Sequence, residues 1–169
     1  MLHFLHSRKG GHDCRRPARN RIDPQDQGPL FPLPDTGQLD ALVNLFTDEA
    51  ICHFGPFGVW TGRATIAENY AQVLEGAIQA KGPFQTLHVN TNHWVELTGS
   101  DTAVGRLYLV DLALGGAPDK NPMVWLGAYD EAYRKVDGAW KISRSSLQFM
   151  WPERHLTDDF PGQSFPFGG

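Results

Sequence analysis

The second half of the chain consists of four long segments in which apolar and polar residues alternate, separated by short turn sequences. Alternation with a period of two is typical of strands that bury one face. The segments span residues 84–97, 102–114, 123–136 and 139–151. Thr98-Gly99-Ser100-Asp101 and Asp137-Gly138 stand between neighbouring segments, and Asp-Gly favours the type I′ turn of a hairpin. The pattern predicts a four-stranded antiparallel meander.

A short stretch with helical periodicity precedes these strands. Residues 38–46 place four apolar side chains on one face, at a spacing of three to four positions. Asp35 or Thr36 stands before this stretch and can serve as its N-cap, so we expect a short amphipathic helix. A brief strand is predicted at residues 51–54, before the turn Gly55-Pro56-Phe57-Gly58.

A second, longer helix is predicted from Thr65 onward. Apolar residues recur there every three to four positions, Thr65 and Glu68 match a capping box, and Gly82-Pro83 supplies a stop signal. Two helices followed by a long antiparallel meander indicate an α+β fold. We expect the amphipathic helices to cover the concave, apolar face of one curled sheet.

Composition separates one folded region from two flanking segments. The chain has 169 residues, of which 41% are hydrophobic, as expected for one globular domain. Residues 1–34 carry five prolines after position 16 and are predicted to form a disordered, basic arm. Residues 152–169 show no periodicity and are predicted to form a tail. The domain is therefore expected at residues 35–151.

The distribution of charge limits the partners of this chain. Residues 1–22 hold six basic and one acidic residue (+5), whereas the other 147 hold nine basic and 18 acidic residues (−9). An acidic body lacks the basic face that nucleic acid requires, so we expect no nucleic-acid partner. No apolar run approaches the roughly 20 residues of a membrane span, so no membrane partner is expected either. Two cysteines make no disulfide framework, which predicts a cytoplasmic protein.

Asp111 interrupts an apolar row on the second predicted strand. Strict alternation places it on the face that carries Gly105, Leu107 and Leu109. A buried carboxylate is costly unless it is paired, which makes Asp111 a candidate for chemistry. The alternative is a bulge near the strand end that turns Asp111 to solvent. Arg106, on the opposite face, is expected to be a structural cation.

His88 is a second candidate, on the first predicted strand. Alternation places it on one face with Thr86, Asn90, Asn92 and Trp94, a mixture of polar and aromatic side chains that suits a pocket or a solvent-facing surface. A histidine with an ordinary pKa near ~6.5 can accept a proton at neutral pH, but it needs a partner to fix its tautomer.

Other reaction classes lose their usual support. His3, His6, His12 and Cys14 lack the paired spacing of a zinc site, so we predict no metal site. The sequence contains no Gly-x-Ser-x-Gly elbow, phosphate-binding loop or His-Glu-x-x-His motif.

Several weak motifs, taken in order, resemble the SnoaL-like proteins of the nuclear transport factor 2-like superfamily. They are Asp35 to Phe46, Thr61-Gly62 to Ile66, Leu87 to Asn92, Gly105 to Asp111 and Tyr129 to Trp140. The resemblance covers residues 35–151 and implies a cone-shaped barrel in which helices pack into a strongly curved antiparallel sheet. It also implies a homo-oligomer, a dimer or trimer.

Within that superfamily the pattern is nearest to bile acid 7α-dehydratase, hexachlorocyclohexane dehydrochlorinase and scytalone dehydratase, which eliminate without a cofactor. The resemblance implies that Asp35 and His88 form a catalytic pair and that Asp111 assists. It departs from the bile acid enzyme where Leu30 and Phe54 replace tyrosines and Phe149 replaces an arginine. The proline-rich arm also takes the place of the family's first helix.

We therefore expect a cofactor-independent lyase, dehydratase-like, or a related isomerase or cyclase, acting on a hydrophobic ring-containing small molecule. The alternatives are a non-catalytic binding or accessory protein and a water-adding enzyme that would use Arg106 beside Asp111. The predicted substrate pocket consists of Phe54, Trp60, Tyr70, Asn90, Tyr108, Trp125, Tyr129 and Phe149.

Overall fold

The computed structural model describes residues 33–81, 85–114, 119 and 123–156. The elements are α1 (Leu39–Val43), β1 (Phe46–His53), η1 (Gly55–Phe57), β2 (Val59–Thr61), α2 (Arg63–Lys81), β3 (Thr86–Leu97), β4 (Thr102–Ala113), β5 (Met123–Val136) and β6 (Ala139–Trp151). No helix in these segments combines the length and hydropathy of a membrane span. The predicted arm lies outside the described residues up to position 32, as does the tail from position 157.

One six-stranded sheet forms the body, in the order β2-β1-β6-β5-β4-β3. Strands β3 to β6 pair antiparallel with their neighbours in sequence, so the predicted meander is confirmed. Asp137 and Gly138 both have positive φ, as a type I′ turn requires. β1 pairs with β6 in parallel, which joins the first half of the chain to the meander.

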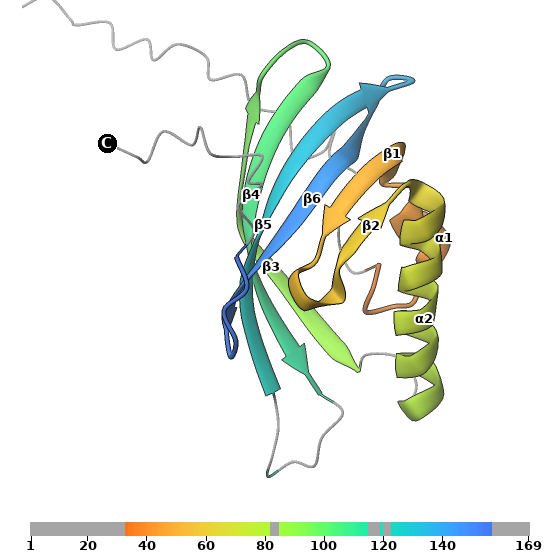
Figure 1. The fold of residues 1–169 in the computed structure, drawn as a ribbon, viewed down its shortest axis with the longest axis vertical. Coiled ribbons are helices and arrows are strands. Elements are labelled where there is room, and N and C mark those ends of the chain that lie inside the picture. Colours follow the sequence, from red (N-terminus) through yellow and green to blue (C-terminus); the bar gives the residue numbers. More distant parts are fainter. Residues whose placement is uncertain (1–32, 82–84, 115–118, 120–122, 157–169) are drawn as a thin grey trace, which may run out of the picture.

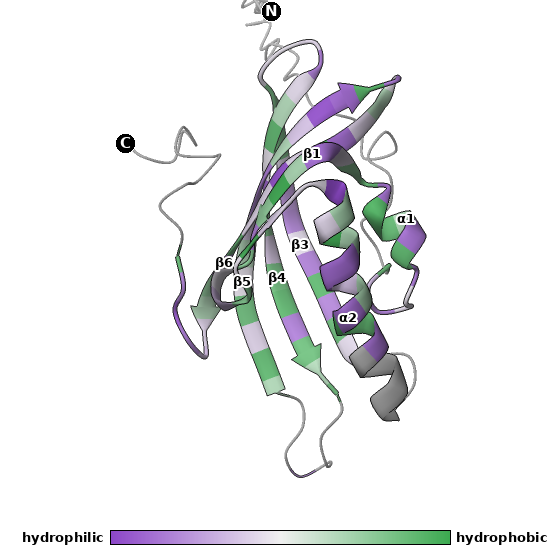
Figure 2. Cartoon of the chain, turned by 45° about the vertical axis from the view of Figure 1, so that its right-hand side comes forward, coloured by the Kyte–Doolittle hydropathy of each residue, from purple (hydrophilic) through white to green (hydrophobic). Residues whose placement is uncertain are grey.

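The two helices lie on the concave side of the curved sheet (Figure 1). α2 contacts β1 and β2, and its Ile66 is fully buried. In Figure 2 hydrophobic and hydrophilic residues alternate along the strands, which gives the sheet an inner and an outer face. The fold is α+β, a curved and mostly antiparallel sheet covered by helices, as predicted.

Three local boundaries differ from the prediction. α1 ends at Val43, and Phe46 lies in β1, because its backbone pairs with Ile142 of β6. β1 is therefore eight residues long and not a brief strand. Leu33, which the predicted boundary left in the arm, is buried in the hydrophobic core.

The predicted helix caps are also wrong. α2 begins at Arg63, directly after Gly62, whose φ of 85° suits glycine. Thr65 therefore lies inside the first turn, where its carbonyl accepts a hydrogen bond from Asn69 Nδ2. Gln38 is the N-cap of α1 and makes no side-chain capping bond.

A bulge in β3 changes which residues face inward. Asn90 pairs with Leu109, but Trp94 pairs with Arg106, so one extra residue lies between these two pairs. Asn92 has a φ of 54° at this point. Even-numbered residues face inward before the bulge and odd-numbered residues after it, so the prediction that placed Trp94 on the face of His88 is wrong.

Candidate active site

A cavity of about 350 Å³ lies on the concave side of the sheet. This volume is in the range of small-molecule sites. Seven of the eight residues predicted for the pocket line it: Phe54, Trp60, Tyr70, Asn90, Trp125, Tyr129 and Phe149. Residues from the start and from the end of the domain sequence line the cavity, including Asp35 before α1 and Phe149 in β6.

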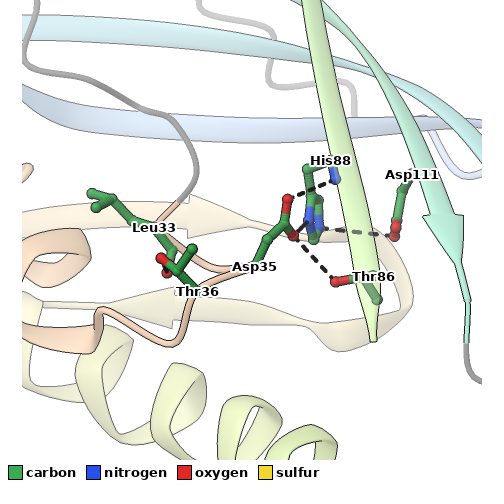
Figure 3. Close-up of polar contacts among 6 residues, drawn as sticks. All are labelled: Leu33, Asp35, Thr36, Thr86, His88 and Asp111. Carbon is green, nitrogen blue, oxygen red and sulfur yellow. Dashed lines mark hydrogen bonds and ion pairs between the residues drawn. The ribbon is translucent and has the colours of Figure 1, made fainter. Parts of the chain in front are cut away.

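Asp35 is buried in the turn before α1 and does not cap that helix (Figure 3). It accepts three hydrogen bonds from β3 instead. His88 Nδ1 lies 2.5 Å from its Oδ1, the His88 backbone nitrogen donates to Oδ2 at 3.0 Å, and Thr86 Oγ1 donates to Oδ1 at 3.3 Å. These bonds hold the carboxylate and the imidazole in one orientation.

The ring of His88 lies between two carboxyl groups (Figure 3). Because Nδ1 faces Asp35, it carries the proton of a neutral ring, and Nε2 is the nitrogen with a free lone pair. Nε2 lies 3.8 Å from Asp111 Oδ2, which is longer than a hydrogen bond. The arrangement therefore presents a basic nitrogen at the wall of the cavity.

Asp111 lines the cavity on β4, and the β4 pairing runs without a bulge at this position. Burial raises the pKa of its carboxyl group, the nearby His88 lowers it, and Asp35 raises it again. Oδ1 of Asp111 and Oδ1 of Asn90 are buried and have no hydrogen-bond partner among the described residues. Unsatisfied acceptors beside a cavity are suited to bind a ligand or water.

Two residues point away from this site. Tyr108 and Arg106 lie on the outer face of β4, and Tyr108 is 47% exposed, so its predicted place in the pocket is wrong. Arg106 Nε lies 2.6 Å from Asp130 Oδ1 and serves as a structural cation. The hypothesis of water addition by Arg106 beside Asp111 is therefore also wrong, because alternation puts these two side chains on opposite faces.

Aromatic rings form most of the remaining wall. Phe54 packs edge-on against Trp60 with 4.8 Å between ring centroids, and Trp60 packs against Tyr70 at 5.3 Å. Trp125 and Phe149 form a second pair at 5.8 Å. The lining contains no lysine or arginine within the described part of the chain. An uncharged ring system is the ligand that such walls accommodate best.

The sequence reasoning missed Glu131. This residue is only 4% exposed and lines the cavity from β5. Burial raises the pKa of its carboxyl group to about 7, although hydrogen bonds from Tyr133 and Ser145 act in the opposite direction. Alternation places Glu131 in one row with Tyr129 and Tyr133, so the pattern that identified Asp111 could also have identified it.

The metal prediction is tested only in part. His3, His6, His12 and Cys14 lie outside the described residues. Within the described segments, no three His, Cys, Asp or Glu side chains form a group that could hold a metal ion.

A family model described as a SnoaL-like domain matches residues 30–146. The chain belongs to this family. The fold is that of the nuclear transport factor 2-like superfamily, and the resemblance identified from the motifs is confirmed. A comparison with curated proteins gives no match.

Solved structures share this fold at low sequence identity. A putative scytalone dehydratase from Novosphingobium aromaticivorans DSM 12444 is 24% identical, with a TM-score of 0.58 over 74% of this chain and 80% of that chain. LinA is 19% identical, with a TM-score of 0.60 over 76% and 82%. An NTF2-like protein with a cystatin-like fold, also from Novosphingobium aromaticivorans, is 20% identical, with a TM-score of 0.60 over 72% and 75%. Such similarity shows the fold alone.

Proposed function

We propose that this SnoaL-like protein is a cofactor-independent lyase that eliminates water or a halide from a hydrophobic, ring-containing small molecule. The observation that carries the proposal is the Asp35–His88 pair at 2.5 Å, with Nε2 of His88 at the cavity wall. His88 is the general base and Asp35 its positioning partner. Asp111 is the acid.

The base removes a proton from a carbon next to a carbonyl group or a comparable activating group. The electron pair of the broken C–H bond forms the new double bond, and the C–O or C–halogen bond breaks. The proton moves to His88 Nε2, and the imidazolium that forms is stabilised by the buried carboxylate of Asp35. Exclusion of water by the aromatic wall strengthens this ion pair.

Asp111 completes the reaction when the leaving group is hydroxide. A protonated Asp111 donates its proton as the C–O bond breaks, which releases water. The shift of its pKa toward higher values favours that protonated form. With 3.8 Å between His88 Nε2 and Asp111 Oδ2, a small side-chain movement returns the proton from the imidazolium to the carboxylate. The enzyme then regains its starting state without any other group.

Two structural neighbours support this class of reaction. One is titled a putative scytalone dehydratase, and LinA is a hexachlorocyclohexane dehydrochlorinase. Both names describe eliminations, of water and of hydrogen chloride. The wall of uncharged rings supports a hydrophobic cyclic substrate for this chain as well.

The proposal can be tested before the substrate is identified. Ketones with acidic neighbouring C–H bonds, such as 2-tetralone, exchange those protons with D₂O when a base removes them. We expect the protein to accelerate this exchange, measured by NMR, and to eliminate water or hydrogen chloride from some cyclic β-hydroxy ketones or γ-hexachlorocyclohexane. His88→Ala should lower the rate by about 10²–10⁴-fold while the Kd of bound ketone changes little. Asp35→Asn should lower it less.

His53→Ala is the matched control. Its neighbour Cys52 is fully buried and pairs with Ser145 of the cavity wall, so His53 points to the other face of the sheet. This variant should exchange protons at the wild-type rate. Exchange that survives His88→Ala, or that falls only in step with binding, would contradict the assignment of the base.

A non-catalytic binding protein is the second candidate. It is favoured by Phe54 and Phe149, which line the cavity where the resemblance places a tyrosine and an arginine. A wild-type protein that binds 2-tetralone in the cavity without accelerating exchange would establish this alternative.

A further inference from the structure

The cavity has a second polar region, remote from His88. On β5, Trp125 pairs with Asp111, whereas Glu131 pairs with Gly105 of β4 and Ser145 of β6. Glu131 lies six positions after Trp125, which corresponds to about 20 Å along an extended strand. The concave face therefore carries one carboxyl pair beside His88 and another carboxyl group toward the opposite end.

The orientation of Glu131 is set by its neighbours. The Tyr133 hydroxyl donates to Oε2, and Ser145 Oγ donates to Oε1 at 3.2 Å. Tyr133 can lie there because Gly105 has no side chain; a Cβ at that position would stand 2.9 Å from the Tyr133 ring. His93 Nε2 lies 3.0 Å from the same hydroxyl and holds it from the other side. Both carboxyl oxygens of Glu131 are thus already engaged.

Two phenol groups beside Glu131 remain open. Tyr70 and Tyr129 both line the cavity. Burial is the main cause of the raised pKa of each hydroxyl, and the charge of Glu131 adds to it; for Tyr129 the charges of Asp111 and Asp35 contribute as well. Their rings pack around Phe54, at 6.2 Å and 6.4 Å between centroids. No hydrogen bond joins either hydroxyl to another described residue. Each hydroxyl can donate one hydrogen bond and accept others, and both stay protonated at neutral pH.

We propose that Tyr70 and Tyr129, beside Glu131, form a subsite that binds an uncharged hydroxyl or carbonyl group at the end of the ligand away from His88. The ligand is then an apolar ring system with polar groups at both ends. The inference rests on the proposed function in that it takes this ligand to be the substrate.

The chemistry of the subsite excludes other ligand groups. A carboxylate or phosphate would meet Glu131, and no lysine or arginine among the described lining residues could pair with it. A protonated amine would have to leave water for a buried site in which Glu131 already accepts hydrogen bonds from Tyr133 and Ser145, and burial of an ion is costly. The phenol hydroxyls are suited to a neutral donor or acceptor, which costs less to remove from water than an ion.

Four probes with one ring system test the subsite: naphthalene, 2-naphthol, 2-naphthoate and 2-naphthylmethylamine, with each Kd measured by isothermal titration calorimetry. We expect wild-type protein to bind 2-naphthol about tenfold more tightly than naphthalene, and the two ionic probes more weakly than 2-naphthol. Tyr70→Phe and Tyr129→Phe keep the ring and remove only the hydroxyl. Each should lower the advantage of 2-naphthol by about three- to tenfold and leave the Kd of naphthalene unchanged.

Two variants serve as controls. Tyr108→Phe removes a hydroxyl on the outer face of β4 and should keep the full advantage of 2-naphthol. Asp35→Asn alters the opposite end of the cavity and should also keep it. The inference is overturned if both cavity phenylalanine variants retain the advantage, if Asp35→Asn removes it, or if the amine binds more tightly than 2-naphthol.

Failure of this inference and failure of the proposed function give different results. The binding measurements require no turnover. If the protein does not accelerate proton exchange but still prefers 2-naphthol over naphthalene through Tyr70 and Tyr129, the elimination is contradicted and the subsite is supported. If exchange depends on His88 but the Tyr70→Phe and Tyr129→Phe variants do not change the preference for 2-naphthol, the elimination is supported and the subsite is contradicted.

Discussion

At the scale of single residues, two buried carboxyl groups of the cavity differ in what surrounds them. Asp35 accepts three hydrogen bonds, two of them from His88, and these fix the orientation of its carboxyl group. Glu131 accepts two hydrogen bonds, from Tyr133 and Ser145. Burial raises the pKa of its carboxyl group by more than these two bonds lower it. A pKa of about 7 means that Glu131 changes its protonation in the physiological pH range.

This shift makes stability depend on pH. The pKa of Glu131 is about 7 in the folded chain, against a reference value of 4.5, so the folded state binds its proton more tightly. Its contribution to stability is complete below pH 4.5 and is lost as the pH rises through about 7. We expect the melting temperature to fall between pH 5 and pH 8. Glu131→Gln should flatten this fall and raise the melting temperature at pH 8.

The comparison of the two proteins isolates Glu131. Burial raises the pKa of Asp130 to about 6, so Asp130 also lowers stability as the pH rises. Burial lowers the pKa of His93, which has the opposite effect on the pH dependence of stability. Both residues are present in the wild type and in Glu131→Gln, so their effects cancel in the comparison. Thermal unfolding followed by circular dichroism at four pH values gives the two curves. Parallel curves would show that Glu131 is ionised to the same extent in the folded and unfolded chains.

At the scale of elements, the strand pattern predicted the inward row of β4 but only half of β3. Strict alternation requires an unbroken ladder, and Asn92 breaks it by adopting a left-handed backbone conformation. Asparagine is one of the few residues that tolerate this conformation, but the same residue is common on strand surfaces and turns, so sequence alone does not place the bulge. After it, Val95 and Leu97 face the core.

The bulge makes position 92 sensitive to the shape of its side chain. A β-branched residue at a φ of 54° is strained by about 1–2 kcal/mol, so Asn92→Val should lower the melting temperature by roughly 3–8 °C. Asn92→Gly, which fits the conformation, should match or exceed the wild type. Glu96→Val introduces the same residue at an exposed position of the same strand and should have little effect. Equal losses for both valine variants would rule out backbone strain as the cause.

The expected helix cap at Asp35 shows where local sequence signals fail to predict hydrogen-bond partners. Asp35 stands before an amphipathic segment and matches a helix cap, but its carboxylate bonds to residues 51 and 53 positions further along the chain. Local sequence preference cannot distinguish a helix N-terminus from β3 as the source of donors, because either can supply hydrogen bonds to the Asp35 carboxylate. The resemblance to SnoaL-like proteins implied the Asp35–His88 pair, and the geometry brings these residues together. That the pair is catalytic stays a prediction.

At the scale of the whole molecule, the order of elements predicted the fold class and the meander. The parallel pairing of β1 with β6 was not predicted, since it joins residues nearly 100 positions apart and leaves no local pattern. Leu33 is buried for the same reason: its contacts come from the assembled core and not from its neighbours in sequence. What the sequence did not predict thus depends mainly on contacts that form only when the sheet closes.

The outer face of the sheet leads to the last prediction, that two copies of the chain associate there. Leu87, Val89 and Tyr108 lie on this face and are 40%, 39% and 47% exposed. β3 stands at the edge of the sheet, so no strand of the described segments pairs with one side of its backbone. Apolar side chains beside an open edge are typical of association surfaces. We expect a dimer at micromolar concentration by light scattering.

A single charge should separate the two copies. Val89→Lys places an ammonium group beside Leu87 on the outer face of the edge strand β3 and should give a monomer, because burying an unpaired charge is costly. Val136→Lys makes the same change at the end of β5, beside the hairpin turn, and should leave the dimer intact. Because the cavity lies on the concave side, the monomer should keep the Kd of 2-naphthol. A wild-type monomer, or a dimer that survives Val89→Lys, would show that this face is not the interface.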